Sequence, residues 1–543
     1  MSTLDGDVGG AVAGGAVGGP GAVGLHTLGR WPADRARATP HRVAIDDRGV
    51  VVTYAELEAR ASALAAALLD AGYGVGDRVA TLTGNSADHV VLFFACAKAG
   101  LVLVPLSWRL SPRELGQQLE RADPALLLVE DEFAALANAA TDALIEPPHA
   151  WRLGRDGVEH AVPAPRRRGP ERPPVRAVRD DDALLIIFTS GTTAAAKGAI
   201  LTHANCFWTN LSLSRIAGIG AEDVVLAVMP QYHAGGWNIH TLLAWWVGAT
   251  VVLERTFDAG RALHLIADRG ITTMMGVPAN YRFLALHPDF DGADLSSLRH
   301  AIVGGAPMPE SLLRVWHARG VALSQGYGLT EAAPNVLCLP DEDALARAGS
   351  AGTPYPHVEV AVADPVTGER LDGPASGELL VRGPNVFAGY FRDPEATAAV
   401  MVDGWLATGD LVERDADGYF RIVDRIKDIF ITGGESVAPA EVESVLAAHP
   451  AVADACVVGV PDDTWGEVPV AWVVLRAGAF ADTEELVAHC AASLARFKTP
   501  RAVRIVRELP RNSASKVVRR ALLQRWLVES GAVAVDADAG RRA

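Results

Sequence analysis

The sequence contains little cysteine for its length. Its 543 residues include five cysteines, Cys96, Cys206, Cys338, Cys456 and Cys490. They lie far apart, without a Cys-x-x-Cys pair and without the histidine spacing that is typical of zinc sites. This pattern predicts buried free thiols in a reducing compartment and excludes a disulfide-based scaffold. We therefore expect a cytoplasmic protein.

The chain also lacks an excess of positive charge and an unbroken hydrophobic span. Its formal net charge is −16, which argues against a nucleic-acid partner. Residues 1–25 are mostly Gly, Ala and Val without a basic start, so we expect a disordered tail and no secretory signal. The longest apolar stretch, residues 89–108, is interrupted by Lys98, Gly100 and Pro105. It predicts a buried helix followed by a strand, with no transmembrane segment.

The composition does provide for more than one hydrophobic core. Half of the residues are hydrophobic and 21% are charged. A chain of this length exceeds the size at which a single core keeps growing, so two or more domains are expected. We find no internal repeats.

The first part of the chain alternates helices and strands. A helix is predicted over residues 54–69, ending at Gly72, and strands over residues 78–82 and 101–105 with another helix between them. This alternation predicts α/β architecture with parallel sheets covered by helices. Residues 163–182 are rich in Pro, Arg and Asp, which indicates an exposed connection between subdomains.

A second change of composition occurs near residues 424–428. Beyond it the pattern predicts helices over residues 438–449 and 483–494 and strands over residues 453–460 and 468–475. We place a domain boundary at residues 426–428. The predicted organisation is a tail (1–25), a large N-terminal domain (26–426), a small C-terminal α+β domain (427–530) and a second tail (531–543).

One loop carries the strongest chemical signal. The apolar run 183–188 predicts a buried strand, and the residues that follow it combine hydroxyl groups, a glycine and a lysine: Thr189, Ser190, Gly191, Thr192, Thr193 and Lys197. Hydroxyl groups, backbone N–H groups and a lysine suit the oxygens of a polyphosphate. A Walker A loop would need glycine before the lysine and Ser or Thr after it, and the chain has Ala196 and Gly198. The loop therefore predicts a nucleotide-binding site in an enzyme other than the usual Walker A nucleotide hydrolases.

Two glycine-containing segments add candidates for base and metal binding. Residues 302–307 form a strand that runs into Gly304, Gly305, Ala306 and Pro307, where a flat ring could lie on the backbone. Residues 325–331 place Tyr327 between glycines, with Thr330 and Glu331 close behind. Tyrosine can stack on a base, and glutamate can hold a divalent cation that bridges phosphates. Taken alone, the first segment is as well explained by an ordinary tight turn.

Two later segments end in charged residues. Asp410 follows a glycine and could accept both hydroxyls of a ribose, or simply cap a turn. Lys516 lies in a polar loop before a helix that we expect to begin near Val517. Considered alone, Lys516 would be interpreted as a solvated lysine.

In this order and spacing, the segments resemble the adenylate-forming superfamily of acyl- and aryl-CoA synthetases, luciferases and peptide-synthetase adenylation domains. The resemblance extends from about His26 to Trp526 and is closest to bacterial fatty-acid–CoA ligases, with the runs 304–310 and 343–352 standing out. It implies a large N-terminal domain of helix-covered mixed sheets and a small, mobile C-terminal domain.

The resemblance also implies roles in an adenylation step. Residues 189–197 would wrap the β- and γ-phosphates of ATP, and Thr189 and Glu331 would coordinate Mg²⁺. Tyr327 would stack on adenine, with Gly304 to Pro307 on the other side of the base and Thr330 nearby. Asp410 and Arg425 would hold the ribose hydroxyls. Lys516 would bridge the substrate carboxylate and the α-phosphate.

For the second step, the resemblance implies that the C-terminal domain rotates about Lys427. The loop of Gly433, Gly434 and Glu435 would then approach the pantetheine of coenzyme A. His233 resembles the gate between the acyl pocket and the thiol channel, and its alternative is a buried structural histidine. Three positions depart from the family pattern: residues 194–196 are all alanine, Ser515 replaces a glycine, and Lys427 replaces the aspartate of many relatives.

The same resemblance places an acyl pocket among small and apolar residues: His233, Gly235, Gly236, Trp237, Asn238, Ile302, Val303, Gly326 and Ala332. No carboxylate that could hold an amino group lies between His233 and His240, so we expect a fatty or aromatic acid. Trp237 would either shorten this pocket or form its wall.

The predicted function is an ATP-dependent acid–CoA ligase that forms an acyl-AMP intermediate, with ATP, Mg²⁺ and coenzyme A as cofactors and a small carboxylic acid as partner. One alternative hands the acyl group to a carrier protein. Another is a non-catalytic adenylate-binding homologue. The sequence leaves open whether the protein forms a homodimer.

Overall fold

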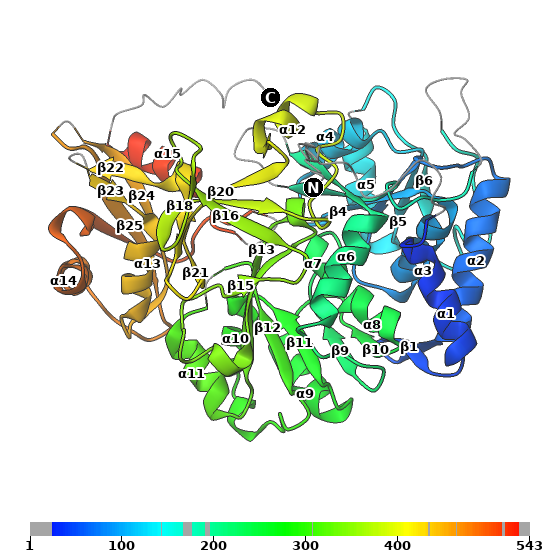
Figure 1. Ribbon diagram of the computed structural model, residues 1–543, viewed down its shortest axis with the longest axis horizontal. Helices are drawn as coiled ribbons and strands as arrows, with labels where there is room; N and C mark the ends of the chain where they lie inside the picture. The colour runs from blue at the N-terminus through cyan, green and yellow to red at the C-terminus, as the bar shows by residue number, and fades with distance from the viewer. Residues whose placement is uncertain are drawn as a thin grey trace, which may run out of the picture.

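Four β-sheets and the helices packed on them form the described part of the chain. The computed structural model describes residues 24–142, 144–166, 176–189, 196–306, 308–432, 435–462, 464–512 and 516–530. The first helices lie at one end of the molecule and the C-terminal elements at the other (Figure 1). The predicted tails, residues 1–25 and 531–543, lie outside the described residues except for Gly24 and Leu25.

The largest sheet has nine strands in the order β15-β14-β13-β12-β11-β9-β10-β1-β2. Its six central strands are parallel, and β2, β14 and β15 add antiparallel edges. The strands are β1 (Val43–Asp47), β2 (Val50–Thr53), β9 (Val224–Ala227), β10 (Thr250–Leu253), β11 (Thr273–Gly276), β12 (His300–Val303), β13 (Leu323–Gly328), β14 (Asn335–Leu339) and β15 (Thr353–Pro354).

A second sheet has six strands in the order β6-β5-β3-β4-β7-β8 and is parallel except for the β7–β8 hairpin. Its strands are β3 (Arg78–Leu82), β4 (Val102–Leu106), β5 (Leu126–Val129), β6 (Ala150–Arg152), β7 (Ala183–Thr189) and β8 (Lys197–Thr202).

The third sheet is antiparallel, in the order β17-β16-β18-β20-β19 with β21 paired to β20. Its strands are β16 (Glu359–Ala363), β17 (Arg370–Leu371), β18 (Ala375–Arg382), β19 (Met401–Val402), β20 (Trp405–Arg414) and β21 (Phe420–Arg425).

The fourth sheet belongs to the C-terminal part and runs β23-β22-β25-β24, with β26 parallel to β25. Its strands are β22 (Phe430–Thr432), β23 (Glu435–Val437), β24 (Val452–Asp462), β25 (Gly466–Leu475) and β26 (Ala502–Val506). The short helix η6 (Ile426–Asp428) connects β21 of the third sheet to β22 of the fourth.

Helices cover these sheets. In the N-terminal part they are α1 (Trp31–Ala38), α2 (Tyr54–Asp70), α3 (Ala87–Ala99), α4 (Pro112–Ala122), α5 (Ala134–Thr141), α6 (His203–Ser214), α7 (Ala234–Asn238), α8 (Thr241–Val247), α9 (Ala259–Asp268), α10 (Pro278–Ala285), α11 (Glu310–Ala318) and α12 (Pro394–Val400). The C-terminal part has α13 (Pro439–Ala448), α14 (Thr483–Ser493) and α15 (Arg519–Glu529). None of the helices in the described residues has the length and apolar character needed to cross a membrane.

The central strands of the nine-stranded sheet are buried on both faces. In β9, Val225 belongs to one hydrophobic core and the next residue, Leu226, to another. In β11, Met274 and Met275 divide between the same two cores. Alternation of side chains between the two faces explains why these strands are almost continuously apolar in sequence.

The predicted α/β class and most predicted elements are confirmed. Helix α2 spans residues 54–70, and Thr53 and Glu56 form a capping box that fixes its start. Strand β3 matches residues 78–82, and α14 spans residues 483–493, with Asp482 as its N-cap. All five cysteines are free and buried, as expected. The described residues between 163 and 182 contain no helix or strand.

The predicted start of the last helix, near Val517, is wrong by two residues. Val517 instead forms a β-bridge with Arg511, and the Val518 amide donates to the Pro510 carbonyl at 2.8 Å. These bonds tie Val517 and Val518 back to residues 510 and 511, so α15 begins only at Arg519.

One hydrogen bond crosses the connection between the third and fourth sheets. Asp424, in β21, accepts from the amide of Ala440, in the first turn of α13, at 2.7 Å. A carboxylate at a helix N-terminus satisfies a free N–H group and interacts favourably with the helix dipole. This contact joins the first turn of α13 to the last strand of the third sheet.

Candidate active site

The parallel strands β9, β11, β12 and β13 end at one edge of the nine-stranded sheet, and most of the predicted site lies beyond that edge. Because parallel strands share a direction, the residues after each strand meet there. Gly304 to Ala306 follow β12, Tyr327 lies at the end of β13, and the turn that carries His233 follows β9. Gly305 has φ +78°, a conformation that favours glycine.

The phosphate loop is the tip of the β7–β8 hairpin. Thr189 and Lys197 are register partners, and the Thr189 hydroxyl donates to the Lys197 carbonyl at 3.4 Å. Lys197 Nζ lies 5.0 Å from the centre of the Tyr390 ring. The Tyr390 hydroxyl in turn donates to Glu331 Oε1 at 2.8 Å. The hairpin lysine and the predicted metal ligand Glu331 are therefore linked through one tyrosine, which the sequence reasoning missed.

Several predicted site residues cannot be placed. Ser190, Gly191, Thr192 and Thr193 lie outside the described residues, as do Ala194 and Ala195 of the alanine run. The same is true of Pro307, Gly433, Gly434 and Ser515. Their predicted roles stay predictions.

The donor set near the hairpin fits a magnesium ion bound together with phosphates. Within the described residues, no group of three or more His, Cys, Asp or Glu side chains could hold a metal on its own. Strand β8 packs against the short helix η4 (Thr330–Ala332), which carries Glu331. Mg²⁺ is commonly bound by one or two protein oxygens plus substrate phosphates, so the carboxylate of Glu331 and the hydroxyl of Thr189 suit it.

Asp410 is the centre of a buried polar cluster. It pairs in register with Arg425 across β20 and β21, and Arg425 Nε lies 2.6 Å from Asp410 Oδ1. The other carboxylate oxygen accepts a hydrogen bond from the Tyr327 hydroxyl. Burial, and then the Asp410 charge, raise the pKa of Tyr327 well above its ordinary value, so the phenol stays protonated. The cluster joins three of the predicted nucleotide residues.

Lys516 extends from the C-terminal part toward the same cluster. Lys516 is an exposed residue, yet desolvation by the protein around its amine lowers the pKa of Lys516, and the positive charge of Arg425 lowers it further. The carboxylates of Asp410 and Glu331 act in the opposite direction. The loop is held by a pair of 2.9 Å hydrogen bonds between Asn512 and the Lys516 backbone. The structure therefore brings Lys516 together with Asp410, Arg425 and Glu331.

Lys427 lies in η6, between the last strand of the third sheet and the first strand of the fourth. Burial lowers the pKa of its amine, while the neighbouring carboxylate of Asp428 acts to raise it. Glu435 is exposed at the start of β23, on the C-terminal side of the same connection. Its predicted role beside pantetheine stays a prediction.

His233 precedes the short helix α7 in a tight turn. Its amide donates to the Pro230 carbonyl at 3.1 Å, and a Cβ atom on Gly236 would come within 2.2 Å of that same carbonyl oxygen. Glycine is therefore required at position 236. Burial, with smaller contributions from Lys516 and Arg109, lowers the pKa of His233 to about 4. The imidazole beside the predicted acyl pocket is neutral at pH 7.

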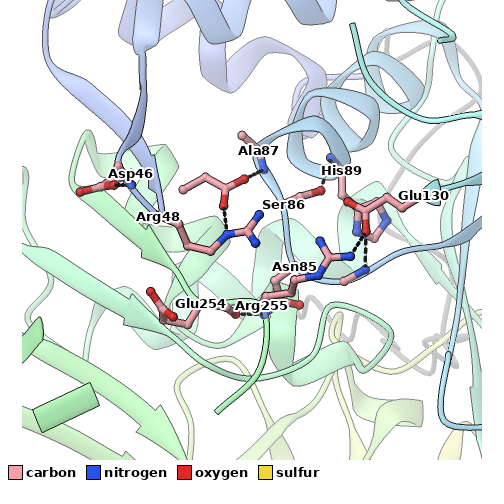
Figure 2. A network of polar contacts seen from close by, with 12 residues as sticks. Asp46, Arg48, Asn85, Ser86, Ala87, His89, Glu130, Glu254 and Arg255 are labelled. Atoms are coloured by element: carbon pink, nitrogen blue, oxygen red, sulfur yellow. Dashed lines mark hydrogen bonds and ion pairs between the residues drawn. The ribbon is translucent and has the colours of Figure 1, made fainter. Parts of the chain in front are cut away.

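A buried polar network supports the turn that carries His233. Asn85 Nδ2 donates to the carbonyls of Met229 and Glu254 at 3.0 and 3.1 Å, and Asn85 Oδ1 accepts from the Gln231 amide at 2.9 Å. Gln231 Oε1 lies 3.0 Å from His89 Nδ1. Figure 2 shows Asn85 beside Ser86 and Ala87 at the start of α3, with Glu130 and Arg255 paired close by. Residues of both large sheets thus position the His233 turn.

The sequence reasoning did not find Asn85, Gln231 or Tyr390. Asn85 bonds a carbonyl 144 residues away, and no local pattern marks such a contact. A weak signal existed for Tyr390, because it follows Gly389 as Tyr327 follows Gly326.

The predicted acyl-pocket residues come from α7 and the turn before it, from β12 and β13, and from η4. Trp237 is fully buried, stacks on Phe93 with ring centroids 4.6 Å apart, and donates through Nε1 to the Gln231 carbonyl at 2.6 Å. Asn238 is also fully buried and accepts from Asn210 Nδ2 at 3.0 Å. Their contacts show how the turn is anchored, and their share in a pocket stays a prediction.

On the strand side, Ile302 and Val303 are buried, and Ala332 is fully enclosed. A Cβ atom on Gly304 would lie 3.3 Å from the Gly326 carbonyl oxygen, so these two strand ends approach closely. Little room is therefore left for a side chain at position 304.

Comparison with known proteins agrees with this geometry. Residues 33–391 match the family model of AMP-binding enzymes, and residues 441–516 match that of the AMP-binding enzyme C-terminal domain. The chain is 39% identical over 500 residues to a feruloyl-CoA synthase of Amycolatopsis, covering 92% of this chain and 99% of that protein. It is 38% identical over 503 residues to an indoleacetate–CoA ligase of Aromatoleum aromaticum, covering 90% and 96%.

A solved structure of ATP-bound MatB from Rhodopseudomonas palustris superposes with a TM-score of 0.82 at 33% identity, covering 92% of this chain and 99% of that one. The matches span both the large N-terminal part and the smaller C-terminal part. The chain therefore belongs to the AMP-binding, adenylate-forming enzyme superfamily.

Proposed function

We infer that this protein is an AMP-forming acid–CoA ligase that activates an aromatic or fatty carboxylic acid with ATP and transfers the acyl group to coenzyme A. The observation that carries this function is the convergence of Lys516 from the C-terminal part with Asp410, Arg425 and Glu331 from the N-terminal part. Relatives at 38–39% identity over most of the chain are named CoA ligases, which supports the same reaction.

In the first step, a carboxylate oxygen attacks the α-phosphorus of ATP, and the bond to pyrophosphate breaks. Both reactants are anions, so the site must offset their repulsion. We assign this role to the ammonium group of Lys516, which would bridge the acyl carboxylate and the α-phosphate. Asp410, oriented by Arg425 and Tyr327, would accept the ribose hydroxyls and fix the nucleotide.

The γ- and β-phosphates would lie against the β7–β8 hairpin, where Lys197 supplies a positive charge. A magnesium ion held by Glu331 and Thr189 would neutralise charge on the phosphates when bound. The hydrogen bond from Tyr390 fixes the Glu331 carboxylate for that purpose.

In the second step, the thiol of coenzyme A attacks the acyl carbon, and AMP leaves. Lys516 has no assigned role in this step. We propose a rotation at Lys427 that withdraws Lys516 and presents Glu435 to the pantetheine. The neutral His233 would line the passage between the acyl carbon and the thiol, where it adds no charge that would hold the AMP anion.

ATP–pyrophosphate exchange with a panel of aromatic and fatty acids tests the first step, and thioester formation with coenzyme A tests the second. We expect exchange with at least one class of acid and a thioester with free coenzyme A. A thioester formed only with a carrier protein would move the function to acyl-carrier loading. ATP binding without exchange for any acid would favour a non-catalytic adenylate-binding protein.

A further inference from the structure

Arg519, the first residue of α15, connects three other elements of the C-terminal part. Its Nη2 donates to Oε1 and Oε2 of Glu443, in α13, at 2.7 and 2.8 Å. Its Nε donates to the carbonyl of Val457, in β24, at 3.3 Å. Its Nη1 lies 3.8 Å from Oδ2 of Asp428, the last residue of η6. One guanidinium group therefore joins α15 to α13, to β24 and to the connection that precedes the fourth sheet.

The carboxylate partner of Arg519 is itself held in place. Oε1 of Glu443 also accepts the amide of Val457 at 2.8 Å, so the ion pair is bonded to both backbone groups of one residue of β24. The side chains of Arg519 and Glu443 are only 26% and 21% exposed. Burial raises the pKa of Glu443, and the charge of Arg519 acts against this rise. Charged hydrogen bonds of this kind are strong and fix the geometry of both partners.

The same arginine lies three residues after Lys516. On the other side of Lys516, Arg511 forms an ion pair with Asp454, which also belongs to β24. Arg511 and Val517 are joined by a β-bridge. The backbone that carries Lys516 is therefore attached to β24 at two points, through Arg511 before it and through Arg519 after it.

The position of this backbone matters because Lys516 acts across a domain boundary. Lys516 belongs to the C-terminal part, whereas the charged groups around its amine, Arg425, Asp410 and Glu331, belong to the N-terminal part. A lysine side chain has a flexible four-carbon stem, so its amine is placed only as well as its backbone is. A misplacement of about 1 Å can lower a rate by roughly 10²-fold.

We propose that Arg519 is a positioning residue for adenylation, which holds the backbone of Lys516 through its contacts with Glu443, Val457 and Asp428. This inference rests on the acid–CoA ligase function proposed above. Arg519 acts through Lys516 and has no contact with the nucleotide or the acid in this role. Because Lys516 has no assigned role in thioester formation, the loss of Arg519 should affect the first half-reaction alone.

The variant Arg519→Gln tests this division. Adenylation is followed by pyrophosphate exchange with an acid that the wild-type protein accepts, and thioester formation is measured from a supplied acyl adenylate. We expect kcat of adenylation to fall by roughly 10- to 100-fold, with the rate of thioester formation near that of the wild type. A residue that only stabilises the C-terminal part would lower both rates, because the proposed second step also uses this part. An equal loss in both half-reactions, or no loss in either, would overturn the proposal.

Glu443→Gln tests the same contact from its other side. Glutamine keeps the size of the side chain and an acceptor for the Val457 amide, and it removes the charge that faces Arg519. This variant should show the same selective loss of adenylation. The double variant should lose no more than the more impaired single variant, because both substitutions break one interaction. Additive losses would contradict a role of Arg519 through Glu443.

Val442→Ala is the control for stability. Val442 is the neighbour of Glu443 in α13 and is fully buried in the core of the C-terminal part. The cavity left by its truncation should lower stability to urea, and the ratio of the two half-reaction rates should not change. A ratio that shifts as it does in Arg519→Gln would show that the selective loss reports stability, which would overturn the proposal.

Arg520→Gln is the control for charge. It removes an exposed positive charge one residue beyond Arg519, and both half-reactions should keep their wild-type rates. A selective loss of adenylation in this variant as well would contradict a specific role of Arg519. The proposed function itself is tested by the wild-type protein: exchange with none of the acids contradicts that function, whereas normal wild-type exchange with equal losses in Arg519→Gln contradicts the role of Arg519 alone.

Discussion

The nucleotide end and the acyl end of the proposed active site differ in the charge of their side chains. At the nucleotide end, the charged side chains of Lys516, Arg425, Asp410 and Glu331 are placed close together. At the acyl end, burial lowers the pKa of His233 to about 4, so this imidazole carries no charge at pH 7. Binding of anionic phosphates requires charged groups at fixed positions, whereas binding of an apolar acyl group requires a pocket without charge. Substitutions at the two ends should therefore fail in different half-reactions.

The largest effect is expected for Lys516→Ala. Removing this ammonium group should lower the rate of adenylate formation by about 10²- to 10³-fold, the usual cost of losing one preorganised donor. Thioester formation from a supplied acyl adenylate should stay near the wild-type rate. The two half-reactions are measured separately, by pyrophosphate exchange and by thioester release. An equal loss of rate in both half-reactions would contradict the assignment of Lys516 to adenylate formation alone.

Asp410→Asn should give the next largest effect. The change removes a buried charge that pairs with Arg425 and accepts from Tyr327, and charged hydrogen bonds contribute about 1.5–3 kcal/mol each. We expect KM for ATP to rise by roughly 10- to 100-fold, with KM for the acid little changed. Asp415→Asn, just beyond β20 and paired with Arg347 at the surface, is the control. A rise in KM for the acid alone would contradict the ribose assignment.

A smaller effect should appear in the pH dependence of the first step. Because the pKa of free Lys516 is lowered from the ordinary lysine value of 10.5, its positive charge is lost as the pH rises through a lower value. The kcat/KM of adenylation should therefore decrease at alkaline pH, with a midpoint below pH 10.5. The rate of thioester formation should lack this alkaline limb. In Lys516→Arg the limb should move to higher pH, since guanidinium stays charged. If the same alkaline decrease appeared in both half-reactions, Lys516 would not be the group that causes it.

Asn85→Ala probes the support of the acyl end. The variant leaves the carbonyls of Met229 and Glu254 and the amide of Gln231 without a partner, at about 1–3 kcal/mol for each buried group. We expect lower stability to urea and a several-fold higher KM for coenzyme A, because the His233 turn loses its anchor. KM for ATP should hardly change.

Ser86→Ala is the control for Asn85→Ala. It removes the cap of α3 at about 1 kcal/mol without touching the turn, so stability should fall and KM for coenzyme A should not. A parallel rise in KM in both variants would show that Asn85 acts only through stability.

The sequence predicted elements more completely than it predicted the site. Strong periodicity fixed the helix that starts at Tyr54 and the strands around residues 78–82 and 468–475, because burial of one face or both leaves a local pattern. Asp410 and Arg425 were both identified, but only strand register shows that they are paired. Contacts such as that of Asn85 with Met229 leave no local pattern in the sequence. The last helix began later than expected because a bridge between residues 511 and 517 competes with its first turn.

The hydrogen bond from the Ala440 amide to Asp424 has a kinetic consequence. Its two partners lie on opposite sides of Lys427, so the rotation proposed at that residue would have to break it. Burial raises the pKa of Asp424, while the hydrogen bond from the Ala440 amide acts to lower it. In the proposed rotation this bond would act as a latch. Its lifetime would then set how long the protein, loaded with its adenylate, waits before it can accept a thiol.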